Sequence, residues 1–136
     1  MASLQLGNFV TLANRFDFSK YKTVLDVGGA NAQLSRALAG RHPHLSLLSY
    51  LPALHDWNED ARRKLIAKAY ASLPAGGALI AIESVIDDAR RQNAFGLLMS
   101  LNMLIEFGAD GGFDYTGAQY DGWCREAGFS HTEFYL

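Results

Sequence analysis

A short β-type run that ends in two glycines constrains the fold of this chain more than any other feature. The run occupies residues 23–27 with the sequence TVLDV, and Gly28 and Gly29 follow it. Residues 32–41 then show helical spacing, with two leucines four positions apart. Glycines between a strand and a helix let a ligand approach the backbone, and the first helical amides can bind a carboxylate or phosphate. The pattern therefore predicts a strand, turn and helix that hold a nucleotide-like ligand.

Apolar runs alternate with helical patterns along the rest of the chain. Further strands are predicted at 45–51, 78–85 and 130–136, and helices at 7–14, 58–73, 92–107 and 117–127. The run at 78–85 lacks polar alternation, which is typical of a strand covered on both faces. Strands that alternate with helices predict an α/β fold with a mostly parallel sheet and helices on both faces.

Charge and composition exclude several classes of protein. The net charge is -2, and the basic residues at 62, 63, 64 and 68 are predicted to form a solvated helix face, so we expect no nucleic-acid partner. The single cysteine, Cys124, excludes an internal disulfide and fits a reducing, cytoplasmic location. Polar residues interrupt every apolar stretch well before it reaches the length of a membrane span, so we expect no membrane contact.

Three motifs are predicted to meet at one edge of the sheet. Gly28 and Glu83 lie at the carboxyl ends of predicted strands, and His55 follows another in the tetrapeptide Leu-His-Asp-Trp. Ligands of open α/β sheets bind beyond the carboxyl ends of the parallel strands, so these residues are candidates for a common site. The dinucleotide pattern of three glycines is not met, because Ala30 and Gln33 occupy the second and third places, which disfavours an NAD enzyme.

Five ordered segments make the chain resemble the S-adenosylmethionine-dependent O-methyltransferases of small molecules, the caffeate and acetylserotonin type. The segments are Leu25–Gly29, Leu54–Trp57, Leu73–Gly77, the strand with Glu83, and Trp123–Phe129. The resemblance implies a Rossmann-like class I methyltransferase fold, truncated relative to the family, with residues 1–136 as a single catalytic domain. It also implies S-adenosylmethionine as cofactor, S-adenosylhomocysteine as product, and a small aromatic acceptor that carries a hydroxyl group.

The resemblance implies a role for individual residues as well. His55 matches the general base, Glu83 the carboxylate that orients it, and Asp114 the place of a second carboxylate. An imidazole suits this task, because its proton affinity near neutral pH matches the removal of a hydroxyl proton during methyl transfer. The residues expected to bind the cofactor are Asp26, Gly28, Gly29, Ala30, Asp56 and Trp57. Those expected to contact the acceptor are Met99, Asn102 and Met103, and no metal is expected.

Each of these residues also has a structural interpretation. His55 could start a helix and bond only to backbone, Glu83 could pair with an arginine, and Asp114 could form a turn. Met99 and Met103 are four positions apart and could belong to the core. His42 and His44 are expected at the surface, and a metal site that combines them with His55 is not favoured. Cys124 is expected to be an inert core thiol.

The chain departs from the family between Gly29 and His55. One helix and one strand occupy an interval that in the family holds further strands and helices, so roughly fifty residues, about a βαβ-type unit or somewhat more, are missing. Ala30 and Ala32 replace two further glycines, and no clear ribose-binding acid remains. We expect an omitted or deleted internal segment, and a homodimer weakened by the lack of the family's N-terminal domain.

Two other functions remain open at this point. One is a truncated methyltransferase-fold scaffold that binds no cofactor and performs no catalysis, pairing with another chain through an exposed edge. The other is a different nucleotide-binding module that uses the Gly28-Gly29 turn.

Overall fold

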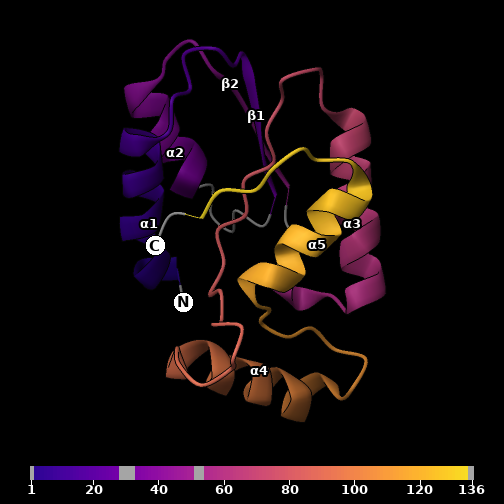
Figure 1. Cartoon of the computed structure of the whole chain (residues 1–136). Helices are drawn as coiled ribbons and strands as arrows, with labels where there is room; N and C mark the ends of the chain where they lie inside the picture. Colours follow the sequence, from indigo (N-terminus) through magenta and orange to yellow (C-terminus); the bar gives the residue numbers. More distant parts are fainter. Residues whose placement is uncertain (1, 28–32, 51–53, 135–136) are drawn as a thin grey trace. The chain divides into compact units, whose positions relative to one another are not determined.

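The computed structural model describes residues 2–27, 33–50 and 54–134. The chain divides into two compact units, Met1–Ala53 and Leu54–Leu136, and each is described by itself. Figure 1 shows the helices and strands of both units. The expectation of a single catalytic domain stays a prediction.

The first unit contains the strand, turn and helix that the glycine motif predicts. Its elements are α1 (Ala2–Arg15), β1 (Thr23–Val27), α2 (Gln33–Arg41) and β2 (Ser46–Tyr50). The two strands pair in parallel, from Thr23 opposite Ser46 to Val27 opposite Tyr50. Helix α2 packs against α1 and β2. Residues 28–30, which include the predicted turn, lie outside the described residues.

An aromatic and aliphatic cluster forms the core of the first unit. The buried side chains are Phe9, Ala13, Phe18, Leu34 and Leu38. Full burial of each large apolar side chain contributes about 1.5–3 kcal/mol, so the cluster is the main source of stability here. His42 and His44 fasten its edge, because their Nε2 atoms bond the backbone oxygens of Ala13 and Phe18 at 2.9 and 3.2 Å.

The second unit is built around two packed helices. Its elements are the 3₁₀ turn η2 (Leu54–Asp56) and the helices α3 (Glu59–Ser72), α4 (Ala94–Phe107) and α5 (Gly117–Ala127). Helix α3 packs against α5, and the buried cluster between them consists of Ile66, Tyr115, Tyr120, Trp123 and Cys124. Burial raises the pKa of the Cys124 thiol, as expected for an inert core cysteine.

Helix α5 has the boundaries that its sequence predicts. Thr116 accepts a hydrogen bond from the backbone of Gln119, and the Gln119 side chain accepts one from the backbone of Thr116. Gly128 ends the helix with a φ of 112°, a conformation that other residues rarely adopt. A Cβ atom at Gly128 would lie 2.7 Å from the Tyr70 ring of α3, so packing also requires glycine there.

The strands predicted at 78–85 and 130–136 are wrong for the residues that the structure describes. Residues 78–85 and 131–134 have no regular structure, and the nearest pairing is a single bridge between Ile86 and Thr116. A strand needs a neighbour that takes its backbone hydrogen bonds, and no described strand lies beside these segments. In the described part of the chain, no helix has the length and apolar character needed to cross a membrane.

Candidate active site

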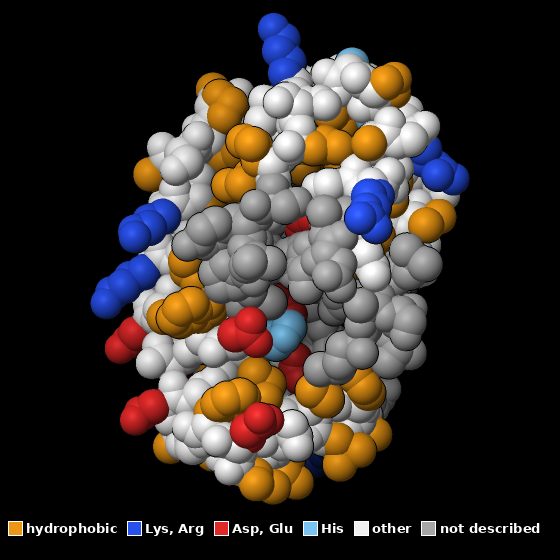
Figure 2. Space-filling view, turned by 180° about the vertical axis from the view of Figure 1, so that it is seen from behind, with side chains coloured by type: hydrophobic (Ala, Val, Ile, Leu, Met, Phe, Trp, Pro, Cys, Tyr) orange, Lys and Arg blue, Asp and Glu red, His pale blue; other side chains and the backbone are white. Residues whose placement is uncertain are grey.

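An imidazole bonded to a nearly buried carboxylate is the centre of the candidate site. His55 lies in η2, and its Nδ1 is 2.5 Å from Oε2 of Glu83, whose side chain is 7% exposed. An ionised carboxylate only accepts hydrogen bonds, so Nδ1 carries the proton and donates it. Nε2 is then the basic nitrogen, and it lies 3.4 Å from the exposed carboxylate of Asp56. Figure 2 shows a histidine with acidic side chains beside it on the molecular face.

Asp114 is the third member of the site. It is buried at 4% exposure, and one ligand atom each of His55, Glu83 and Asp114 lies within 4.8 Å of the others. Burial raises the pKa of Asp114 to about 6, and the bond to Glu83 raises the pKa of His55. The structure therefore brings the three predicted catalytic residues together. One imidazole and two carboxylates could also ligate a divalent cation, so the expectation of no metal stays a prediction.

A buried arginine holds the backbone on both sides of this cluster. Arg62 of α3 is 0% exposed, and its guanidinium donates to the backbone oxygens of Leu54, His55 and Phe113. It thereby ties η2 to the loop that leads into Asp114. The prediction of a solvated residue at position 62 is wrong. The signal was available, because Arg62 lies four positions before the buried Ile66.

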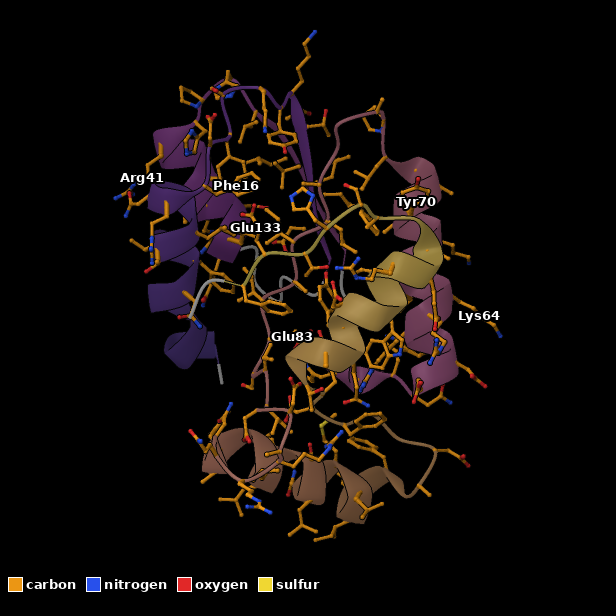
Figure 3. The ribbon with its side chains drawn as sticks, viewed as in Figure 1. Phe16, Arg41, Lys64, Tyr70, Glu83 and Glu133 are labelled. Carbon is orange, nitrogen blue, oxygen red and sulfur yellow. The ribbon has the colours of Figure 1, made fainter. Side chains whose placement is uncertain are left out.

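Aromatic rings offset part of the desolvation cost of the buried Arg62 guanidinium. Its guanidinium carbon lies 4.0 Å from the centre of the Phe113 ring and 5.0 Å from that of Tyr115. Burial lowers the pKa of Arg62. Lys64 of the same helix points outward (Figure 3).

Sequence reasoning also missed a close backbone approach at the site. A Cβ atom at Gly112 would collide with the backbone oxygen of His55, so glycine is required where the loop passes η2. The backbone amide of Asp114 donates to Oγ of Ser100 on α4 at 2.8 Å, which fixes the far end of the loop. The adjacent glycines at 111 and 112 are the signal that could have indicated this contact.

The remaining predicted site residues differ in what the structure shows. Asp26 is buried in β1, whereas Gly28, Gly29 and Ala30 lie outside the described residues. Asp56 and Trp57 are exposed. Of the residues expected to contact the acceptor, Met103 is buried, Met99 is half-buried and Asn102 is exposed. An open hollow of about 270 Å³ is lined by other residues of α4 and by the loop after it. The roles of these residues stay predictions.

Comparison with known proteins identifies the family. The O-methyltransferase domain family matches residues 47–130. The chain belongs to this family. Among curated O-methyltransferases, it is 42% identical over 79 residues to the 3-hydroxy-5-methyl-1-naphthoate 3-O-methyltransferase of Streptomyces sahachiroi, covering 58% of this chain and 22% of that protein. It is 30% identical over 162 residues to the tetracenomycin polyketide synthesis 8-O-methyl transferase of Streptomyces glaucescens, covering 88% and 47%.

Solved structures show the class I methyltransferase fold. Human N-acetylserotonin methyltransferase, solved in complex with S-adenosylmethionine, superposes with a TM-score of 0.80 at 21% identity, over 98% of this chain and 48% of that one. The chain spans about half the length, or less, of these O-methyltransferases. The alignment with the tetracenomycin enzyme is 162 positions long but includes only 88% of the 136 residues of this chain. About 40 aligned positions of that enzyme therefore have no counterpart here, a total comparable to a βαβ unit.

Proposed function

We propose that this chain transfers a methyl group from S-adenosylmethionine to a hydroxyl of a small aromatic acceptor in the cytoplasm, with His55 as the general base. The observation that carries the proposal is the bond from His55 Nδ1 to Glu83, which leaves Nε2 as a proton acceptor. The cofactor supplies a methyl group on a sulfonium and leaves as S-adenosylhomocysteine. The name of the Streptomyces sahachiroi relative, a 3-hydroxy-5-methyl-1-naphthoate 3-O-methyltransferase, supports the aromatic acceptor class.

His55 acts on the acceptor, whereas Glu83 and Asp114 act on His55. Nε2 removes the hydroxyl proton as the acceptor oxygen attacks the methyl group in line. The imidazole becomes positively charged at that moment, and the carboxylate of Glu83 stabilises the charge through the hydrogen bond already present. Asp114 adds a second negative group within 4.8 Å. Both carboxylates therefore favour the protonated product form of the base.

The described residues fit the amino-acid part of the cofactor. Asp26 is buried, and Oε1 of Gln33, at the start of α2, is buried without a hydrogen-bond partner in the part of the chain that the structure describes. The unpartnered oxygen of Gln33 is a suitable acceptor for the ammonium group of a methionine moiety. Gly28, Gly29 and Ala30 are proposed to hold the cofactor in the first unit. Asp56 and Trp57 are the residues of the second unit proposed to contact it.

A methyl-transfer assay tests the role of His55. Wild-type chain and the His55→Ala variant are incubated with S-adenosylmethionine and a panel of hydroxynaphthoates, and S-adenosylhomocysteine is quantified by mass spectrometry. We expect a loss of about 10²–10⁴-fold in kcat for His55→Ala. His131→Ala is the matched control, because the His131 side chain is exposed and lies outside the cluster around His55. Equal rates in wild-type chain and His55→Ala would contradict the proposal.

A chelator distinguishes base catalysis from metal catalysis at the same three residues. Treatment with EDTA should leave the rate unchanged, because the proposed mechanism requires only the imidazole and its carboxylates. Loss of activity that zinc or manganese restores would assign the cluster to a metal and contradict the proposed base.

A second candidate function is a scaffold that has the family's fold but does not bind the cofactor. Two observations favour it: the total of about 40 positions of the tetracenomycin enzyme that have no counterpart in this chain, and the lack of any Asp or Glu between Asp26 and Asp56 to bind ribose hydroxyls. A scaffold predicts that S-adenosylmethionine leaves the melting temperature unchanged. The catalytic proposal predicts an increase that saturates with cofactor concentration.

A further inference from the structure

The open hollow of the second unit has one charged side chain in its wall. Its volume is about 270 Å³, and its wall consists of residues from α4, the loop after α4 and Arg90. Figure 1 shows α4 and the loop that joins it to α5. The apolar part of the wall includes Leu101, Leu104 and Phe113. Among the described residues that line the hollow, Arg90 is the only one that carries a charge.

The hollow adjoins the residues of the candidate site. Gly112 lines the hollow, and a Cβ atom at this glycine would overlap the backbone oxygen of His55. Ser100 lines it too, and its Oγ accepts the hydrogen bond from the backbone amide of Asp114 at 2.8 Å. A molecule in the hollow therefore lies against the segments that position His55 and Asp114.

The lining of the hollow suits a small aromatic ring. Leu101 and Leu104 are 51% and 52% exposed, so a ring that covers them removes apolar surface from water. Pockets for small molecules have volumes of roughly 300–1,000 Å³ and are mostly apolar, with a few polar groups that orient the ligand. The hollow is at the small end of that range, which favours a compact ligand of one or two rings.

The charge of Arg90 has no acidic partner in the part of the chain that the structure describes. Its guanidinium donates from Nη2 to Oε1 of Gln119 at 2.8 Å, and this acceptor is a neutral amide. Asp87 and Asp88 are close in sequence, but their carboxylates accept hydrogen bonds from the backbone amides of other residues. Nε and Nη1 of Arg90 are therefore available to a ligand.

Both the backbone and the guanidinium of Arg90 are held in place. The backbone amide donates to the oxygen of Asp87 at 2.8 Å, and the φ of Arg90 is 53°, a conformation that residues other than glycine seldom adopt. Oε1 of Gln119, which holds the guanidinium, also accepts from the backbone amide of Thr116 in the cap of α5. An arginine that is already positioned loses less freedom when it binds a ligand.

We propose that Arg90 binds a carboxylate of the acceptor, which makes the acceptor a hydroxylated aromatic acid with its ring in the hollow. A guanidinium presents parallel N–H donors that match the two oxygens of a carboxylate. One guanidinium balances one negative charge, and the nearby carboxylates of Glu83 and Asp114 disfavour the additional charge of a phosphate. This inference rests on the proposed methyl transfer, because only that function makes the ligand an acceptor.

Calorimetric titration measures this binding without any turnover. The ligands are isomeric hydroxynaphthoates and 2-naphthol, which has the same two rings without the carboxylate. We expect wild-type chain to bind at least one of the acids about tenfold or more tightly than 2-naphthol, and Arg90→Gln to bind both kinds with similar affinity. Arg90→Lys should retain only part of the preference, because it keeps the charge but loses the paired donors.

Arg91→Gln is the matched control for this titration. It removes the same charge at the next position, from an exposed residue that does not line the hollow, so it should keep the preference for the acids. Retention of wild-type circular dichroism shows that each variant folds. A wild-type chain that binds the acids no better than 2-naphthol, or a preference that survives Arg90→Gln, would overturn the proposal.

The methyl-transfer assay with the same compounds separates the Arg90 site from the proposed activity. Arg90→Gln should raise KM for the acid about tenfold or more and change kcat less, because Arg90 binds a group that does not react. Binding that depends on the carboxylate, without turnover, would contradict methyl transfer and leave the Arg90 site in place. Turnover of acids and 2-naphthol with the same KM in wild type and Arg90→Gln would contradict the Arg90 site alone.

Discussion

At the scale of single residues, two contacts define the site. Glu83 holds the ring of His55 through Nδ1, and Arg62 holds the backbone of the same residue. The role of Glu83 could be predicted, because a carboxylate in an apolar segment needs a specific partner. The charge of Arg62 did not predict its role, because its burial depends on three backbone oxygens and on the rings of Phe113 and Tyr115, which only the folded chain brings together.

The pH dependence of methyl transfer should report the bond between His55 and Glu83. The base is active when neutral, and Glu83 raises the pKa of His55 above its usual 6.5, so kcat/KM should rise with pH through a midpoint above 6.5. In Glu83→Gln the negative charge is gone, and the midpoint should move to lower pH with a fall in kcat of about tenfold or more. Asp60→Asn, an exposed carboxylate change on α3, should leave the profile unchanged. An unmoved midpoint in Glu83→Gln would contradict the assigned bond.

Arg62→Met should destabilise the second unit. The substitution keeps much of the volume but leaves the backbone oxygens of Leu54, His55 and Phe113 without their donor, at a cost of about 2–4 kcal/mol. The control is Arg63→Met, which removes exposed ion pairs with Glu59 and Glu126 and should cost much less, because solvent screens such pairs. Urea unfolding followed by tryptophan fluorescence measures both. Equal losses would show that Arg62 has no special structural role.

The buried carboxyl of Asp114 should make stability depend on pH. Its pKa is raised from 3.8 to about 6, so its contribution is fully present below about 3.8 and is lost as pH rises through about 6. Asn cannot ionise, so Asp114→Asn should gain about 2 kcal/mol relative to wild type between pH 4 and pH 7.5. Unfolding free energies of both chains at the two pH values measure this difference. A constant difference between the chains would show that Asp114 does not titrate at a raised pKa.

At the scale of elements, local signals located the helices better than the strands. Periodicity and the terminal glycine predicted α5 with its observed ends, and the glycine turn located β1 and α2. The apolar run at 78–85 failed as a strand because β structure depends on a neighbour that a local pattern does not specify. His55 and Glu83 nevertheless meet, because the packing of α3 and α5 positions their segments.

Two glycines of the α5 region should respond to alanine in opposite directions. Gly128→Ala forces a side chain into a φ of 112° and against the Tyr70 ring, so it should lower stability by more than about 1 kcal/mol. Gly122 lies within α5 with no atom near its Cβ position, so Gly122→Ala should raise stability by about 0.5–1 kcal/mol. Thermal unfolding measures both. A stabilising Gly128→Ala would contradict the helix end described here.

At the scale of the whole molecule, the family could be predicted from the sequence, whereas cofactor binding could not. Five ordered motifs were enough for the O-methyltransferase family, and the match over residues 47–130 confirms it. The sequence could not predict the division into two units, or the exposed leucines of α4, because both depend on which surfaces find a partner. The shortfall of about 40 positions against a relative, the size of a βαβ unit, makes cofactor binding the central question.

Calorimetric titration of the folded 136-residue chain with S-adenosylhomocysteine tests that question most directly. If the chain is a methyltransferase with His55 as its base, wild type and His55→Ala should bind one equivalent with similar affinity, because His55 is proposed to act on the acceptor. Folded chain that releases no binding heat at any temperature tested, and shows no thermal shift with the ligand, would contradict the proposed activity.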